Sequence, residues 1–489
     1  MNFSIIKRIL GWILLFEAIF FLVPLITAVI YWEAEFFSFL ISMLLCGLLG
    51  GFCLIGKPKN PNIYTKEGCV IVALCWIVMS LFGALPLFFS GVKAYSNYVD
   101  ALFEIVSGFT TTGATIVASG KEVAALPKCI LMWRSFSHWI GGMGVLVFVM
   151  AFLPLSGARN LHIMKAESPG PEVSKLVPRV RQTAKILYLI YTVITAIQLV
   201  MLLCGGMSFF EALNTSFATG GTGGFSFRED GFASYSSYIQ IVITIFMLLF
   251  SINFTSYYLL CKGKLKEAFN AEVRTFLIIV CVAIALITLN LHFTADQPLQ
   301  GGEALKYSAF SVASVISTTG FAAEAFEYWP MFSQILLVVL MFIGACAGST
   351  GGGLKVSRIL ILSKGAYNEV GRMLHPKLIK KITMDKQVVD HEVVRSINSF
   401  TVAYILIFVV SLLIISLDAY ASDFSTAFTS VAATINNIGP GLAKVGTQGS
   451  FAGYSWWSKI VFIFDMLVGR LEVFPMLVLF APKTWKKGA

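Results

Sequence analysis

Charge is scarce in this sequence. Asp, Glu, Lys and Arg make up 13% of its 489 residues, whereas ordinary soluble domains contain about 25%. Cysteine and histidine are scattered: the nine cysteines include no C-x-x-C pair, and the five histidines show no H-x-x-x-H or H-E-x-x-H spacing. These absences exclude a soluble globular chain, a disulfide framework and a motif-based metal site.

Catalytic pairs are missing as well. We find no Ser/Lys, Asp/Asp or clustered His arrangement suited to chemistry inside a membrane. The sequence therefore predicts that the protein is not an enzyme and that this chain needs no organic cofactor.

Long apolar runs are abundant instead, since hydrophobic residues make up 57% of the chain. About ten runs are long enough to cross roughly 30 Å of hydrocarbon, which indicates helices rather than a barrel. The first contains Glu17 and lacks a small-residue cleavage site, so we expect a first span and not a removable signal. The runs cover 10–31, 36–55, 68–90, 130–154, 184–205, 238–261, 273–292, 333–347, 398–417 and 458–481.

The net charge is +10, and the basic residues are distributed unevenly among the loops. Basic residues gather in alternate loops, around 57–66, 159–185, 262–274 and 364–395, and again after Lys483. This distribution obeys the positive-inside rule and predicts a multi-pass protein with both termini in the cytoplasm. It also explains the charge without nucleic acid as a partner.

A short motif recurs four times along the chain. Thr112-Gly113 lies in SGFTTTGAT, and its counterparts Thr222-Gly223, Thr319-Gly320 and Ile438-Gly439 lie in FATGGTGGFS, SVISTTGFA and TINNIGPG. The copies are about 100 to 120 residues apart, as in an internal repeat. Each follows a segment of about a dozen residues, too short to span and typical of a re-entrant helix. These segments are 97–110, 208–219, 304–317 and 423–436.

The repeats predict an all-α polytopic membrane protein. Non-helical backbone at membrane depth is tolerated only where protein buries it or a water-filled cavity receives it. We therefore expect four pseudo-symmetric membrane-pore loop-membrane repeats around one ion pore. Two N-terminal transmembrane helices are expected over 1–60, and the four repeats over 61–158, 159–265, 266–365 and 366–489.

The glycine turns suit a selectivity filter. Glycine can adopt angles that direct backbone carbonyls towards an axis, and four such loops can replace the hydration shell of a monovalent cation. The alternative is that Thr/Gly clusters are packing contacts between spans, but four copies in one context favour the filter. The predicted filter residues are Thr111, Thr112, Gly113, Gly221, Thr222, Gly223, Thr318, Thr319, Gly320, Asn437, Ile438 and Gly439.

The run at 333–347 ends in GACAGSTGGGLK, residues 344–355. Glycine costs about 1 kcal/mol relative to alanine in a helix, so this cluster predicts an unwound loop. A phosphate-binding loop is excluded, because Lys355 comes one residue late, Val356 replaces the required Ser/Thr and no strand precedes it.

Ionisable residues within spans are costly and suggest function. Arg470 lies about thirty residues beyond the last glycine turn, which places it near the middle of the membrane below the filter. It faces the pore, pairs with Asp465 or Glu472, or does both. Glu104 is a candidate for a negative vestibule, whereas His138, at the mouth of a span, is assigned no role.

The motifs SGFTTTGAT, TGGFS, STTGF and NNIGPG resemble the four filter segments of the Trk/Ktr/HKT superfamily of potassium transporters. GSTGGGLK, GRLEVFP and the two extra N-terminal spans are most similar to the TrkH-like branch, over essentially the whole chain. The resemblance implies potassium as the permeant ion, a homodimer in the cell inner membrane, and a cytosolic nucleotide-binding regulatory ring of the TrkA type. One departure, Gly220 and Gly221 where bulkier residues are expected, predicts a looser second filter.

The resemblance also implies a gate beneath the filter, in which a pore-lining arginine lies beside an intramembrane loop. The predicted gate residues are Gly348, Gly351, Gly352, Gly353, Lys355 and Arg470. Relatives with serine at the first filter glycine favour sodium, so Gly113 indicates potassium-selective uptake. A proton- or sodium-coupled cation symporter is the alternative, favoured if Glu17, Asp465 or Glu472 titrates in the transport path. The basic loops 156–186 and 362–395 are expected to dock the regulatory protein, or else only to contact membrane lipid.

Overall fold

The computed structural model describes the chain apart from residues 57–64, 145–179, 295–300, 376–379, 386 and 486–489. The described residues form helices joined by turns, with one antiparallel pair of two-residue strands, β1 (Thr383–Met384) and β2 (Gln387–Val388). This confirms the expected all-α class. The first three helices are α1 (Phe3–Phe20), α2 (Leu22–Tyr31) and α3 (Phe36–Leu54).

The same order of elements then occurs four times: a long helix, a short helix, a turn and a second helix. Unit 1 contains α4 (Thr65–Gly83), α5 (Leu85–Phe89), η1 (Lys93–Tyr95), α6 (Tyr98–Phe109), α7 (Gly120–Ala124) and α8 (Lys128–Gly142). Unit 2 contains α11 (Val180–Cys204), α12 (Phe209–Gly221), α13 (Ser237–Phe250), α14 (Phe254–Cys261) and α15 (Leu265–Ala268).

Unit 3 contains α16 (Ala271–Phe293), α17 (Gly301–Ile316), η2 (Phe326–Tyr328), α18 (Met331–Ile343) and α19 (Val356–Leu374). Unit 4 contains the strand pair, α20 (His391–Ile415), α21 (Phe424–Ile435), η3 (Ala443–Val445), α22 (Trp456–Leu471), α23 (Phe474–Phe480) and α24 (Pro482–Trp485). The expected boundary at 365 falls inside α19, so unit 3 extends further than the sequence suggested.

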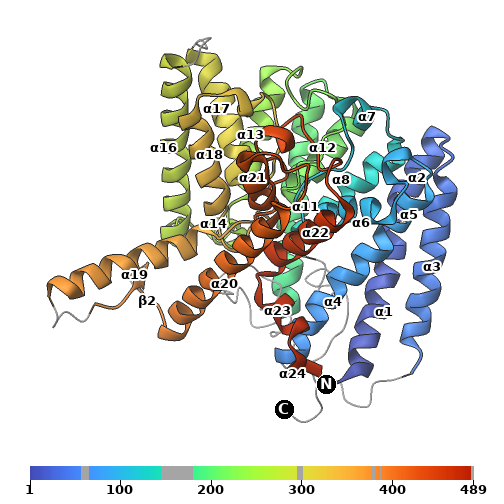
Figure 1. Ribbon diagram of the computed structural model, residues 1–489, viewed down its shortest axis with the longest axis horizontal. Coiled ribbons are helices and arrows are strands. Elements are labelled where there is room, and N and C mark those ends of the chain that lie inside the picture. Colours follow the sequence, from blue (N-terminus) through green and yellow to red (C-terminus); the bar gives the residue numbers. More distant parts are fainter. Residues whose placement is uncertain (57–64, 145–179, 295–300, 376–379, 386, 486–489) are drawn as a thin grey trace.

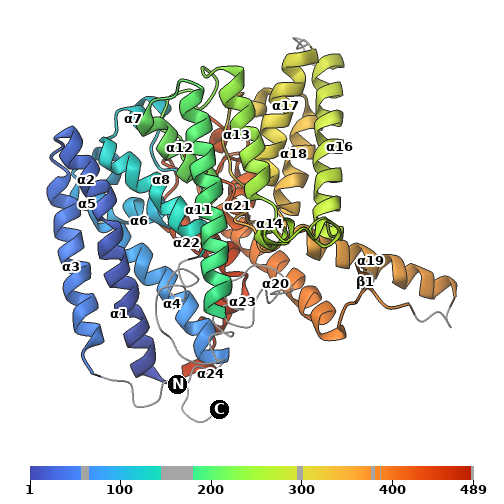
Figure 2. The ribbon, with the colours of Figure 1, turned by 180° about the vertical axis from the view of Figure 1, so that it is seen from behind.

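Helices α1 to α3 lie on one side of the molecule and α16 to α18 on the other (Figures 1 and 2). Helix α19 projects away from the bundle in both views. Helix α24 lies beside the start of α1, where the rings of Phe3 and Trp485 stack with centroids 6.4 Å apart (Figure 1).

Six helices of the described chain are long and apolar enough to cross a membrane, and the bent pair α13 and α14 would be a seventh. The sequence predicted about ten spans. The difference arises because the second helix of each unit stops early: α8 ends at Gly142, α13 at Phe250, α18 at Ile343 and α22 at Leu471. The last part of the predicted span 130–154 lies outside the described residues.

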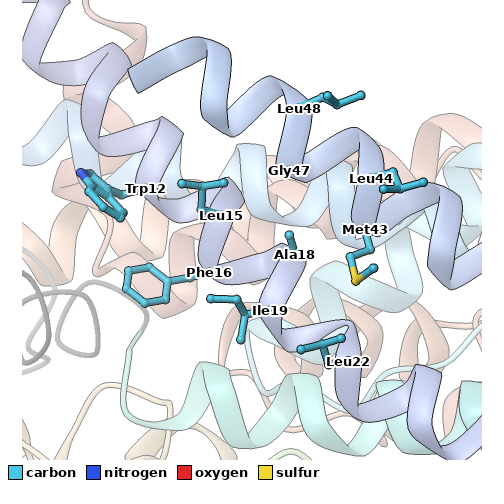
Figure 3. A pocket seen from close by; sticks show the side chains of 10 residues that line it. All are labelled: Trp12, Leu15, Phe16, Ala18, Ile19, Leu22, Met43, Leu44, Gly47 and Leu48. Carbon is cyan, nitrogen blue, oxygen red and sulfur yellow. The ribbon is translucent and has the colours of Figure 1, made fainter. Parts of the chain in front are cut away.

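Helices α1 and α3 pack closely because glycines face each other. A Cβ added at Gly11 would lie 2.8 Å from the Cβ of Cys53, and one added at Gly50 would lie 3.0 Å from the carbonyl oxygen of Gly11. Next to this contact the two helices form a groove of about 490 Å³, lined by apolar side chains such as Phe16 and Met43 (Figure 3). Its exposed rim includes Leu48, at 71% exposure, which suits contact with lipid.

Candidate functional site

Helices α6, α12, α17 and α21 are the four short segments predicted to be re-entrant. Side chains of Asn97, Ser208 and Asp423 accept backbone N–H bonds at three of their N-termini, as good N-caps do. Each of the four is followed by a residue in the left-handed conformation. The N–H of the next residue then donates a hydrogen bond to the carbonyl five residues earlier. The left-handed residues are Thr111, Thr222, Thr318 and Asn437, with φ of 57°, 57°, 60° and 55°. The N–H to O distances are 2.8, 2.8, 2.9 and 2.9 Å.

This is the Schellman ending, which normally uses glycine or asparagine. Threonine is β-branched, so its left-handed backbone is strained and persists only where the surroundings hold it. Hydrogen bonds hold the left-handed residue in units 3 and 4. The hydroxyl of Thr318 accepts from the N–H of Gly352 at 2.6 Å, and the side-chain amide of Asn437 donates to the hydroxyl of Thr112 at 3.0 Å. The strain marks these turns as a candidate functional site.

A glycine with positive φ lies two residues beyond each of these positions. The four glycines are Gly113, Gly224, Gly320 and Gly439, with φ of 80°, 80°, 79° and 93°. The sequence-based register was therefore wrong by one residue in unit 2: Gly224, and not Gly223, is the counterpart of Gly113. The run TGGTGG permits either alignment, and the backbone angles decide between them.

The four glycines form a closed ring. A Cβ at Gly113 would lie 2.0 Å from the carbonyl oxygen of Gly223, and one at Gly224 would lie 1.9 Å from that of Thr319. A Cβ at Gly320 would lie 1.9 Å from the carbonyl oxygen of Ile438, and one at Gly439 would lie 2.7 Å from that of Thr112. Each glycine thus contacts the carbonyl that precedes the glycine of the next unit, in the order 1, 2, 3, 4 and back to 1.

The ring opens into a cavity of about 580 Å³, whose lining includes Gly120, Lys121 and Val123 of α7. All four ring glycines line it, together with charged side chains of both signs, including Arg228, Glu229 and Glu324. All four turns therefore meet at one cavity.

Glu104 and Arg134 form a buried ion pair beside the cavity, which Arg134 lines. The two side chains are 0% and 2% exposed, and Arg134 Nε lies 2.8 Å from Glu104 Oε1. Glu104 also accepts from the N–H of Ile116 at 2.9 Å, and the Arg134 guanidinium lies 4.1 Å from the centre of the Phe225 ring. Glu104 is therefore not part of a negative vestibule, because its charge is held by Arg134 inside the protein.

His138, for which the sequence predicted no role, joins units 1 and 2. Its Nδ1 lies 2.8 Å from the carbonyl oxygen of Gly108, and its Nε2 lies 3.3 Å from the N–H of Phe225. These partners require a neutral ring that donates from Nδ1 and accepts at Nε2.

The second turn is tight rather than loose. A Cβ at Gly223 would lie 2.1 Å from the His138 ring, and one at Gly221 would lie 2.2 Å from the His138 carbonyl oxygen. The expectation of a looser backbone was wrong, since these glycines permit close approach. The extra glycines were the sequence signal for a bulky neighbour, but they could not identify it.

The predicted unwound loop is confirmed: residues 344–355 connect α18 to α19 without helix, and we call them the glycine-rich loop. It lies directly below the ends of two short helices. A Cβ at Gly351 would lie 2.8 Å from the carbonyl oxygen of Ser317, and one at Gly352 would lie 2.3 Å from that of Asn436. Lys355 has φ of 80° and donates to the carbonyl of Gly351. At Gly348 a Cβ would lie 3.0 Å from the Asn253 side chain, and at Gly353 it would lie 2.7 Å from Gly344.

Arg470 bridges the glycine-rich loop and unit 1. Its Nη1 donates to the carbonyl of Thr350 at 2.8 Å, and its Nη2 donates to that of Gly142 at 2.7 Å and to that of Gly141. The arginine therefore binds the loop and the end of α8 at the same time.

The two carboxylates predicted as alternative partners of Arg470 make other contacts. Asp465 accepts from the hydroxyl of Ser411 at 2.7 Å, and Glu472 forms an ion pair with Arg358. The described geometry therefore gives Arg470 a place between two backbone breaks rather than in a simple pair within α22.

Comparison with known proteins places this geometry in a family. The family model described as TrkH, cation transport protein, matches residues 36–487. The chain is 36% identical to the Trk system potassium uptake protein TrkH of Escherichia coli K12, over 100% of both chains. It is 31% identical to the Trk system potassium uptake protein TrkG of the same organism, over 99% of this chain and 98% of TrkG. The crystal structure of the potassium transporter TrkH from Vibrio parahaemolyticus matches with a TM-score of 0.87 and 32% identity, over 99% of this chain and 100% of that one.

Proposed function

Because the chain belongs to the TrkH family of cation transport proteins, we propose that it is the potassium-permeating membrane subunit of a Trk-like uptake system. The observation that carries the proposal is the closed ring of four glycines, each seated against a carbonyl of the next unit. Four turns that meet in this way supply backbone oxygens around one path, and such oxygens can replace the water around a dehydrated potassium ion.

The proposed filter contains the sequence-predicted residues with Gly224 added in unit 2. The carbonyls of the ring belong to Thr112, Gly223, Thr319 and Ile438. The left-handed residue before each of these positions orients its carbonyl. The two groups that stiffen this filter are the buried Glu104 and Arg134 pair and the neutral His138.

The proposed gate is the glycine-rich loop with Arg470. A positive charge below a cation path in low dielectric raises the barrier to an ion. The contacts of Arg470 with Thr350 and Gly142 support this role, because they connect the charge to the segment that would have to move.

A proton- or sodium-coupled symporter is the second candidate. The observation that favours it is Glu17 on α1, which is 0% exposed and whose carboxylate oxygens have no hydrogen-bond partner among the described residues. A buried carboxyl of this kind is suited to carry a proton.

Uptake into liposomes that contain the purified protein separates these functions. We expect potassium to enter at least about tenfold faster than sodium, because the carbonyl oxygens of such a filter replace the hydration shell of potassium better than that of sodium. We expect no change in the potassium rate when a pH or sodium gradient is imposed. Equal rates for the two ions would contradict potassium selectivity, and a rate driven by either gradient would establish the symporter.

The proposed assembly is a homodimer in the cell inner membrane, with both termini in the cytoplasm and a cytosolic nucleotide-binding ring of the TrkA type as partner. Helix α19 supports an assembly, because it projects from the bundle and exposes Tyr367, Val370 and Met373. Most of the loop 156–186 lies outside the described residues. We propose that both basic loops dock the ring.

A pull-down from native membranes in mild detergent tests the partner. We expect the tagged chain to retrieve a nucleotide-binding cytosolic protein, and a variant with Lys380 and Lys381 replaced by glutamine to retrieve less of it, because both lysines lie in the basic loop 362–395. Retrieval of no such protein would favour the alternative, in which the loops only set orientation and contact anionic lipid.

A further inference from the structure

The glycine-rich loop is attached to a second broken helix. Helix α13 ends at Phe250, and α14 begins at Phe254 after a bend of 92°. A break at membrane depth leaves backbone groups without helical partners, and these must be satisfied inside the protein. The loop satisfies three of them. The carbonyl of Ser251 accepts from the N–H of Cys346 at 3.1 Å, and the carbonyl of Phe250 accepts from the hydroxyl of Thr350 at 3.1 Å. The N–H of Phe254 donates to the carbonyl of Gly348 at 3.1 Å.

The two breaks, from units 2 and 3, therefore satisfy each other. The acceptors of all three bonds are backbone carbonyls, so these bonds hold residues 346–350 of the loop largely independently of side-chain identity. Further backbone bonds join the two flanks of the loop: the N–H of Lys355 donates to the carbonyl of Ile343 at 3.1 Å, and that of Val356 donates to the carbonyl of Ala345 at 3.2 Å.

One side chain adds two bonds to this backbone network, one inside the loop and one just after it. Glu272 lies in the first turn of α16 and is 6% exposed. Its Oε1 accepts from the N–H of Ala347 at 2.7 Å and from the N–H of Ser357 at 3.1 Å. Ala347 lies near the start of the loop, and Ser357 lies in the first turn of α19. A single carboxylate oxygen thus connects the beginning of the loop to the helix that follows it.

A carboxylate is well suited to this position. Hydrogen bonds to an ionised acceptor are shorter and stronger than those between neutral groups. A negative charge beside the first turn of α19 is also stabilised by the exposed N–H groups there. The bonds are made in the conformation that seats the loop below the short helices, so they favour this conformation over any other.

We propose that Glu272 is a positioning residue that holds the glycine-rich loop in its seat below the filter, so that its loss releases the loop and raises potassium flux. The second half of this proposal rests on the loop being the gate, as proposed above. The first half concerns only the loop's position and is measured without any flux.

Cys346 reports that position. The side chain lies in the loop and is 0% exposed. A thiol buried in this way is protected from reagents in water, and release of the loop exposes it. Mass spectrometry of the labelled peptides distinguishes Cys346 from the other cysteines.

The experiment compares Glu272→Ala, Glu272→Gln and the matched control Glu267→Gln in the full-length protein. Glu267 lies on the same segment of chain, is 57% exposed and pairs with Lys264. Labelling uses inside-out membrane vesicles and a reagent that does not cross membranes. Potassium flux is measured in liposomes without the partner and is divided by the amount of folded protein.

We expect Glu272→Ala to raise both the Cys346 labelling rate and the flux, each on the order of tenfold, because two charge-assisted bonds are lost. Glu272→Gln keeps an oxygen acceptor without its charge, so we expect a smaller rise in both. The control should match the unaltered protein.

The outcomes are distinguishable. Faster labelling with unchanged flux would support the positioning role and overturn the gate. Labelling of both Glu272 variants at the rate of the control would overturn the positioning role, whatever the flux. If Glu272→Ala does not fold, the labelling of Glu272→Gln against Glu267→Gln decides in the same way.

Discussion

Replacing Gly113 by serine should reduce the preference for potassium over sodium by about tenfold or more, which corresponds to about 1.4 kcal/mol of lost discrimination. The added Cβ would lie 2.0 Å from the carbonyl oxygen of Gly223, so one of the two must move. The residue also has φ of 80°, where a side chain costs roughly 1 to 2 kcal/mol. One of the four ring carbonyls is therefore displaced, and the fit to the larger ion is lost.

Gly91 offers a matched control for this prediction. It has φ of 72°, yet a Cβ there would have no described heavy atom within 4 Å. Gly91→Ser therefore adds similar backbone strain without touching a carbonyl, and we expect it to keep the ion preference. Gly320→Ser should act like Gly113→Ser, because its Cβ would lie 1.9 Å from the carbonyl oxygen of Ile438. Unchanged ion preference in Gly113→Ser and Gly320→Ser would show that the ring is not the filter.

Replacing Arg470 by alanine should increase potassium leak in the absence of the partner by about tenfold or more. Two like unit charges 4 Å apart repel by about 4 kcal/mol at an effective dielectric constant near 20. A tenfold increase in leak requires about 1.4 kcal/mol, so the loss of a third of this repulsion is enough. The substitution also removes the donors that join Thr350 to Gly142 and frees the glycine-rich loop. Deleting two or three residues from 348–353 should have the same effect. Ion preference should not change, because the filter lies above.

Two variants separate charge from geometry. Arg470→Lys keeps the charge but has one ammonium group in place of the planar fork, so we expect an intermediate leak. Arg372→Ala, at an exposed arginine of α19 that pairs with Glu369, should leave flux unchanged. If Arg470 has only a structural role, its loss would lower the yield of folded protein and leave flux per folded molecule at the original value. That result, repeated in the shortened loop, would exclude the gate.

Local patterns determined a large part of this structure. The four short helices ended where the glycine turns were expected, and the glycine-rich loop was unwound between Ile343 and Val356. Both outcomes depend on energies that a residue carries with it: the length of an apolar run, the preference of Asn97 or Asp423 for an N-cap, and the cost of glycine in a helix. They need no knowledge of distant contacts.

The register of the second turn, by contrast, could not be predicted from the sequence. A local preference for glycine in a turn cannot distinguish the neighbouring glycines of TGGTGG. Gly224 was identified only by its φ and by its contact with the carbonyl of Thr319. The roles of Glu104 and His138 were missed for the same reason, because a lone acid or imidazole in an apolar chain does not show its partner.

By itself, then, the sequence determined the membrane class, the four turns and the position of the unwound loop, since each follows from composition and spacing over a few residues. Only the tertiary structure decided which glycines close the ring, what Arg470 binds and which side chain holds the glycine-rich loop. These contacts join distant parts of the chain: Asn437 and Thr112 are 325 positions apart, and Glu272 and Ser357 are 85 apart. Such pairs are brought together by the packing of four units around one centre, and no local preference specifies them.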